Sequence, residues 1–250
     1  MIRSPKYTFT SKPLRNVRCV LLLIPPAAMV LAGIAVAIAA GGGVQLQAQQ
    51  CDPVIVLAEL FDSVTPPALP PGWSSTTWVT SDSGVPSPPA DTLPNAAFVD
   101  DPATINDKQL LSPTLPIKGG SMRVYFRNNF NFQDGFDGGV LEVSFDNGLT
   151  FQDILTAGGT FIAGGYNGGV STCCGNPLAG RQAWTGSSGG FIQTTVNLPI
   201  RLGSNVILRW RMGSDNSVSG EGWRVDSVTI AVPCPTPPRF RPRPTPAPRP

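Results

Sequence analysis

Between Val54 and Val232 the sequence consists of short runs that alternate apolar and polar residues, with Gly, Pro and Asn between the runs. Side chains of a strand point to opposite faces with a period of two, so each run is a candidate half-buried strand. No amphipathic helix of convincing length interrupts them. The pattern predicts an all-β domain built as an antiparallel β-sandwich. The strands expected on this basis cover residues 54–61, 122–126, 140–145, 151–155, 191–198, 206–212 and 223–232.

The run SFDNGLTF (144–151) predicts one of the hairpins. Asn147-Gly148 between two alternating runs is the strongest short-range signal for a tight turn. The run also matches the Asp-box pattern S-x-D-x-G-x-T-W/F, which sialidases carry in several copies. We find one copy here and interpret it as a turn device.

Two long stretches between the strands are rich in turn-forming residues. Residues 66–94 (Pro, Ser and Thr) are expected to form a loop across one sheet, and residues 158–190 (Gly) a large excursion. In the run LRWRM (208–212), alternation places the Leu, Trp and Met inside and Arg209 and Arg211 outside.

Residues 1–49 have the composition of an export signal. A basic start without acids precedes the uncharged run Val20–Ala40, and Ala37-Ile38-Ala39 and Leu46-Gln47-Ala48 are candidate cleavage sites. A cleaved signal peptide and an uncleaved N-terminal anchor both fit, because a run of this length can span a bilayer. Pro25-Pro26 and the Ala/Gly-rich end favour cleavage. Either way we expect a secreted, extracellular protein that meets a membrane only through an uncleaved leader.

The C-terminal residues 235–250 contain eight prolines and four arginines. This composition predicts an extended, disordered tail that acts as a spacer or, alternatively, as a proline-rich ligand for another domain. The sandwich is therefore expected at residues 50–234, a length that suits one domain.

The charge of this expected domain differs from that of the whole chain. All 16 Asp and Glu lie between Asp52 and Asp226 together with nine Lys and Arg, which gives a formal net charge of −7. Nucleic-acid binding depends on basic residues that neutralise phosphates, so no nucleic-acid partner is expected. An acidic exported domain fits cation binding or plain solubility.

Four cysteines follow the leader: Cys51, Cys173, Cys174 and Cys234. Disulfides are permitted outside the cytoplasm, and four cysteines allow three pairings. A Cys51–Cys234 bridge would tie the first strand to the last, while the adjacent Cys173 and Cys174 permit a vicinal bridge, two thiols or bridges elsewhere. Zinc is not expected, since the sequence has no CxxC pair and no histidine.

The absence of histidine excludes Ser-His-Asp and Cys-His catalysis and HExxH metallopeptidases. A glycoside hydrolase needs only two carboxylates, so that class stays open, although no spacing favours it. We predict no catalytic residues. The run FQDGFDGGVLEV (132–143) places Asp134 and Asp137 among glycines, where a hard cation or an ordinary acidic turn would fit equally well.

Aromatic residues in the loop-like stretches are candidates for ligand contact. Trp184 and Tyr166 would stack on sugar rings, and Arg181 would donate hydrogen bonds to hydroxyls. Trp73, which follows Pro-Pro-Gly, is expected to cap the core instead.

The run GEGWRVDSVTI (220–230) contains a conflict. Strict alternation puts Asp226 on the same face as Val228 and Ile230, which are expected in the core. A cation or a partner could meet the carboxylate, or Arg224, two residues away, could pair with it. A solvated strand end would also remove the conflict.

Four runs occur in an order that resembles the jelly-roll domains related to MAM and cleaved-adhesin modules: LAELFDSVTPPALPPGW (57–73), KQLLSPTLPI (108–117), LEVSFDNGLTFQDI (141–154) and GWRVDSVTI (222–230). Such domains occur in bacterial surface proteins and beside immune-inhibitor-A-like metallopeptidases. The resemblance covers about residues 55–232 and implies a jelly-roll β-sandwich at the bacterial cell surface, often with a calcium ion between the first and last strands.

The resemblance also implies ligands for that calcium ion. The family's E-x-F-D start is met by Glu59-Leu60-Phe61-Asp62, and its G-W-x-V-D-D-V end by residues 222–228, with Ser227 in place of the second aspartate. Calcium shared by Glu59 and Asp226, with Asp100 and Asp101 as further ligands, would then explain the conflict at Asp226.

These observations favour a non-catalytic binding or adhesion module with a glycan or surface-protein ligand. The alternatives are a purely structural surface module and a carboxylate-based hydrolase.

Overall fold

The computed structural model describes residues 51–117, 121–199, 201 and 203–235. The leader (1–49) lies outside the described residues, as does the proline-rich tail beyond Pro235, so the predictions about both segments stay predictions. The described part of the chain holds no helix that is long and apolar enough to cross a membrane.

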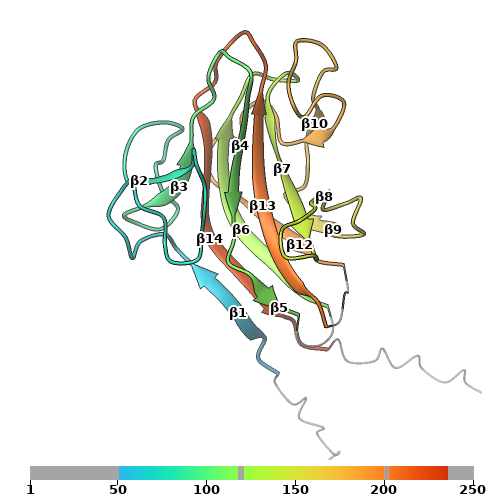
Figure 1. The fold of residues 1–250 in the computed structure, drawn as a ribbon. Coiled ribbons are helices and arrows are strands. Elements are labelled where there is room, and N and C mark those ends of the chain that lie inside the picture. Colours follow the sequence, from blue (N-terminus) through green and yellow to red (C-terminus); the bar gives the residue numbers. More distant parts are fainter. Residues whose placement is uncertain (1–50, 118–120, 200, 202, 236–250) are drawn as a thin grey trace, which may run out of the picture. The chain divides into compact units, whose positions relative to one another are not determined.

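Two large antiparallel sheets share one core (Figure 1). The seven-stranded sheet has the order β2-β3-β14-β6-β12-β9, and β1 also pairs with β14. Its strands are β1 (Val54–Glu59), β2 (Val79–Ser81), β3 (Ala96–Val99), β6 (Arg123–Asn131), β9 (Thr160–Ala163), β12 (Ile192–Asn197) and β14 (Gly222–Val232).

The five-stranded sheet has the order β4-β13-β7-β8, and β5 also pairs with β13. Its strands are β4 (Asn106–Leu111), β5 (Leu115–Pro116), β7 (Gly138–Ser144), β8 (Gln152–Asp153) and β13 (Asn205–Ser214). A separate short pair joins β10 (Gly168–Gly169) to β11 (Gln182–Ala183). The chain changes sheet after β3, β5, β6, β8, β12 and β13, and such repeated crossing between two sheets is expected of a jelly roll. The predicted all-β antiparallel sandwich is confirmed.

The core between the sheets is rich in aromatic side chains. Trp210 and Trp223, from opposite sheets, are both fully buried, and Phe126 packs edge-on against Trp210 with 5.6 Å between ring centroids. In β13 the predicted alternation is confirmed, because the Leu, Trp and Met of LRWRM are buried while Arg209 and Arg211 lie on the outer side.

The predicted hairpin at Asn147-Gly148 joins β7 to β8. Both turn residues have left-handed backbone angles, with φ of 59° at Asn147 and 88° at Gly148, as a turn of this kind requires. The Asp146 carboxylate accepts hydrogen bonds from the backbone N–H and the hydroxyl of Thr150, and these bonds lower its pKa to about 2. The Asp box therefore acts here as a turn device.

Strand β14 does not alternate strictly. Its core-facing side chains are Trp223, Val225, Val228 and Ile230. The inward face changes between Val225 and Val228 because the pairing with β6 slips between Asp226 and Thr229. Ser227, with φ of 51°, lies in this β-bulge. The prediction that Asp226 shares a face with Val228 was wrong, because it assumed an uninterrupted strand.

The described residues contain two disulfides, Cys51–Cys234 and Cys173–Cys174. The first joins the segment before β1 to the segment after β14, with 5.7 Å between the Cα atoms. The second joins adjacent residues in the excursion between β10 and β11. The structure thus selects one of the three pairings that the sequence left open.

Candidate functional site

The outer side of the five-stranded sheet carries a connected set of charged and polar side chains, which we call the polar face. Its members come from four strands and one loop. They are Asp107 and Gln109 on β4, Arg209 and Arg211 on β13, Glu142 on β7, Asp153 on β8, and Arg181 just before β11.

Strand register brings these side chains together. Arg209 lies directly opposite Glu142 on β7, and Arg211 lies directly opposite Gln109 on β4. Cross-strand neighbours on one face have Cβ atoms about 5 Å apart. Because both arginines point outward from β13, each lies within reach of acidic side chains on the neighbouring strands.

Glu142 is the centre of the polar face. Its Oε1 accepts hydrogen bonds from Arg181 at 2.6 Å and from Arg211 at 3.4 Å, and its Oε2 accepts from Arg209. The three guanidinium groups cover the carboxylate, so Glu142 is only 2% exposed although it points out of the sheet. A carboxylate buried in this way is stable because each oxygen has charged donors.

The two ends of the polar face are also ion-paired. Arg211 binds Asp107 with both nitrogens of its fork, at 2.8 and 2.7 Å, and Arg181 binds Asp153 at 2.8 Å. Burial alone would raise the pKa of Asp107, but the hydrogen bonds and charge of Arg211 outweigh burial and lower it. Asp107 is therefore ionised at neutral pH.

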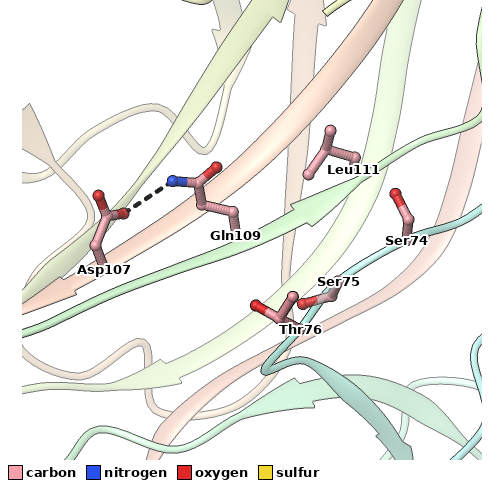
Figure 2. Close-up of a pocket in the computed structure, with 6 residues that line it drawn as sticks. All are labelled: Ser74, Ser75, Thr76, Asp107, Gln109 and Leu111. Atoms are coloured by element: carbon pink, nitrogen blue, oxygen red, sulfur yellow. Dashed lines mark hydrogen bonds between the residues drawn. The ribbon is translucent and has the colours of Figure 1, made fainter.

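A shallow pocket of about 380 Å³ opens at the β4 edge of the polar face. Figure 2 shows Asp107, Gln109 and Leu111 on β4, and Ser74, Ser75 and Thr76 on the neighbouring segment. Gln109 donates to Asp107 at 3.2 Å and accepts from Arg209 at 3.1 Å, so it joins this pocket to the network. The lining is mostly hydroxyl, amide and carboxylate, which suits a polar ligand.

The structure corrects one of the three predicted ligand contacts, that of Trp184. Trp184 is fully buried, because it pairs with Gly139 on β7 and its ring packs 4.9 Å from Tyr166 and 5.6 Å from Trp223. The Tyr166 hydroxyl donates to the Leu141 carbonyl or to Asp153 and accepts from the Leu141 N–H, so it is occupied within the domain. The Trp184 ring therefore presents no free surface for stacking, while the Tyr166 side chain is partly buried and remains a predicted contact.

Arg181, the third predicted contact, does lie on the polar face. A second pocket, of about 240 Å³, adjoins it at the β8 edge and is lined by Asp153, Leu155, Thr156, Arg181 and Gln182. Phe151, which was not predicted as a ligand contact, lies beside the polar face. Its ring lies 3.9 Å from the Arg209 guanidinium. The sequence did contain a signal for this residue, because Phe151 is the aromatic that ends the Asp box.

The four predicted calcium ligands have separate partners. Glu59 accepts from the Phe61 N–H at 2.8 Å, and Asp100 pairs with Lys108 at 2.7 Å. Asp101 is buried and accepts from the Gly220 N–H at 3.0 Å. Among the described residues, no group of three or more acidic, cysteine or histidine side chains is spaced to hold a metal ion as it stands. Calcium between Glu59 and Asp226 stays a prediction.

Asp226 meets backbone donors of the loop that crosses the seven-stranded sheet. Its Oδ2 accepts from the N–H groups of Asp91 and Thr92 at 2.8 and 2.9 Å, and its Oδ1 accepts from Ser227 at 2.6 Å. Arg224 and Asp226 form no ion pair; the guanidinium instead donates to carbonyls of the same loop. Both side chains therefore hold the loop of residues 81–92 on the sheet.

The buried carboxylate of Asp226 predicts a pH effect. Burial raises its pKa to about 6, although the three N–H donors oppose this. Such a group stabilises the fold fully below an unfolded pKa of about 4, and this contribution is lost as pH rises through about 6. We expect the free energy of unfolding of wild type, measured in urea with chelator present, to fall between pH 4 and pH 7. In Asp226→Asn this fall should be smaller by about 1–2 kcal/mol, a value that allows for solvent screening. Parallel curves for the two proteins would contradict this.

No protein-family model and no curated protein matches the sequence. Solved structures that match include the CBM22-1 xylan-binding domain of Paenibacillus barcinonensis Xyn10C, at 11% identity over 75% of this chain and 100% of that one, with a TM-score of 0.43. The K1 cleaved adhesin domain of Lys-gingipain from Porphyromonas gingivalis W83 matches at 15% over 71% and 98%, with a TM-score of 0.40. TmCBM61, solved with β-1,4-galactotriose, matches at 12% over 63% and 85%, with a TM-score of 0.39. These values do not assign the chain to a family.

Proposed function

We propose that this chain is an exported, non-catalytic binding module that holds a glycan on the polar face. The observation that supports this most directly is the network of fixed donors and acceptors joined through Gln109 to a hydroxyl-lined pocket. Sugar hydroxyls both donate and accept, so planar carboxylate, amide and guanidinium groups can each bind them. Ion pairs already hold these side chains, which reduces the ordering cost of binding.

The two disulfides support the export part of the proposal. Such bridges persist in oxidising compartments and are rare in the cytosol. They agree with the basic and apolar leader at residues 1–49, which we interpret as a signal peptide or an anchor.

The same geometry is poorly suited to hydrolysis by two carboxylates. A glycoside hydrolase needs one carboxyl group that delivers a proton at working pH. On the polar face, both oxygens of Glu142 are held by arginines, and the pKa of Asp107 is lowered. Binding is therefore the function that this surface favours over turnover.

A glycan array with the full chain, expressed through export so that its disulfides form, tests the proposal. Binding to a defined sugar class is expected, and Gln109→Ala should weaken it about tenfold, because the variant loses hydrogen bonds at the pocket edge. Isothermal titration with the sugar identified on the array would measure the change.

Gln193→Ala is the matched control, since Gln193 is exposed on β12 in the other sheet. It should bind as wild type does. An equal loss in both variants would contradict a site on the polar face. A blank array from folded protein would favour a protein ligand or a purely structural role.

A further inference from the structure

Three aspartates lie inside the end of the sandwich at which β13 passes into β14, at the top of Figure 1. Asp101 follows β3, Asp137 immediately precedes β7, and Asp215 immediately follows β13. Strand pairing brings the three loops together, because Gly213 lies opposite Gly138, and Trp223 lies opposite both Val99 on β3 and Phe130 on β6. The exposed fractions of the three aspartates are only 3%, 0% and 1%.

Each carboxyl group uses one oxygen within the protein. Asp101 Oδ2 accepts from the Gly220 N–H at 3.0 Å, and Asp137 Oδ1 accepts from the Asp215 N–H at 2.6 Å. Asp215 Oδ1 accepts from the N–H and hydroxyl of Ser217 at 2.7 and 2.8 Å. These bonds fix the orientation of all three side chains.

The other oxygen of each carboxyl group is buried without a hydrogen-bond partner. Asp101 Oδ1, Asp137 Oδ2 and Asp215 Oδ2 are the carboxylate oxygens in this state within the described part of the chain. Buried acceptors of this kind are rare in folded proteins, and each calls for a partner. The carboxyl groups of Asp101 and Asp137 are close enough to hydrogen-bond to each other when one of them is protonated, and a bound cation would replace that proton.

No positive side chain balances this charge among the described residues. None of the ion pairs there involves Asp101, Asp137 or Asp215, and nearby Lys108 is paired with Asp100. The arrangement is therefore costly at neutral pH unless a cation joins it.

We propose that Asp101, Asp137 and Asp215 form a binding site for a divalent cation, of which Ca²⁺ fits best. The available ligands are all oxygens, which hard cations prefer, and they come from loops rather than from rigid strand centres. Ca²⁺ accepts six to eight oxygens in variable geometry, whereas Mg²⁺ demands a near-ideal octahedron.

The three carboxyl groups are not yet spaced as a complete metal shell. The carboxyl groups of Asp101 and Asp137 are within hydrogen-bonding reach of each other. We expect these two to bind first and Asp215 to complete the set from the loop that it begins. The site differs from the Glu59–Asp226 site that the family resemblance implies, and it shares no residue with the polar face.

The test is a Ca²⁺ titration of the full exported chain after removal of metal by chelator. Isothermal titration should show saturable binding at one site. The melting temperature should rise by about 5–10 °C at a hundredfold excess over Kd, because the ion binds only the folded chain. Ca²⁺ should bind more tightly than Mg²⁺.

Asp137→Asn keeps the shape of the side chain and its bond from Asp215 but removes one charge. This variant should lose both the heat of binding and the rise in melting temperature. In chelator it should be at least as stable as wild type, because it relieves repulsion between buried carboxylates. A merely structural aspartate would instead lose stability in chelator, so that result would overturn the proposal. Asp215→Asn repeats the test if Asp137→Asn does not fold.

Asp134→Asn is the matched control, since Asp134 is an exposed residue of the same loop. It should respond to Ca²⁺ as wild type does. The proposal is overturned if wild type gives no response, if Asp137→Asn keeps the full response, or if Asp226→Asn alone abolishes it. These outcomes are independent of glycan binding, which is measured at the other surface.

Discussion

Replacing Arg224 with Met is expected to destabilise the protein by about 3–5 kcal/mol, the range for breaking a buried charged network. Arg224 is fully buried on the outer side of β14, beneath the loop of residues 81–92. It donates to five backbone carbonyls of that loop: Pro86, Pro89, Ser81, Ser83 and Val85. Its guanidinium also lies 4.6 Å from the ring of Phe98.

The size of the effect follows from what the variant leaves behind. The carbonyls are backbone acceptors that take their side-chain donors from Arg224, so Met would leave them without these donors. Burial lowers the pKa of Arg224 only to about 10, and the side chain keeps its charge at neutral pH. Lys cannot replace the planar fork that reaches five acceptors, so Arg224→Lys should recover less than half of the loss.

Urea unfolding of wild type, Arg224→Met and Arg224→Lys measures the loss directly. Arg123→Met is the matched control, because Arg123 is a half-buried arginine of β6 that bonds mainly to Asn197, and it should cost no more than about 1 kcal/mol. Limited proteolysis should cut within residues 81–92 in Arg224→Met before global unfolding. A loss below about 1 kcal/mol, with the loop still protected, would show that the loop does not depend on this side chain.

Local patterns in the sequence were sufficient for much of the fold. The Asn147-Gly148 turn and the alternation around Trp210 depend on neighbours within a few residues, and both are confirmed. Strand β4 was missed because its residues NDKQLL include only two apolar side chains and it lies at a sheet edge. Propensity and alternation are both weak in such a strand.

The bulge in β14 could not be predicted from local composition. Ser227 adopts φ of 51°, a conformation in which Gly or Asn would have been a signal and Ser is not. This one residue reverses the orientation of Asp226 relative to Val228, so the face on which the Asp226 carboxylate lies could not be read from the sequence.

The sequence predicted which side chains of β13 point outward in the candidate site, but not which residues they contact. Alternation places Arg209 and Arg211 outside, but their partners Glu142, Asp107 and Asp153 belong to strands whose register is set by long-range pairing. For Trp184 the local sequence was misleading. Its Gly-rich context indicates an exposed loop, but a β-bridge to Gly139 places the side chain in the core. Loops that return to a sheet are not marked by composition.

Removing the Cys51–Cys234 bridge with a Cys51→Ser/Cys234→Ser double variant is expected to cost about 2–5 kcal/mol and to lower the melting temperature by about 5–15 °C. The bridge closes a loop with a sequence separation of 183, and the entropy it removes from the unfolded chain grows with loop length. It also holds β1, whose one sheet partner among the described strands is β14 and whose residues Val54 and Ile55 are exposed. We therefore expect the amides of Val54–Glu59 to exchange faster in the variant.

The vicinal pair supplies an internal comparison, since Cys173→Ser/Cys174→Ser makes the same chemical change. The bridge between adjacent residues closes almost no chain loop, so its loss should cost less than about 1 kcal/mol if unfolded-state entropy is the main term. Thermal and urea unfolding of both double variants, with hydrogen exchange at β1, separates the two contributions. If both variants lost equal stability, loop entropy would not explain the effect. If the first lost stability without faster exchange at β1, the bridge would act through the unfolded chain alone and not by fastening the first strand to the last.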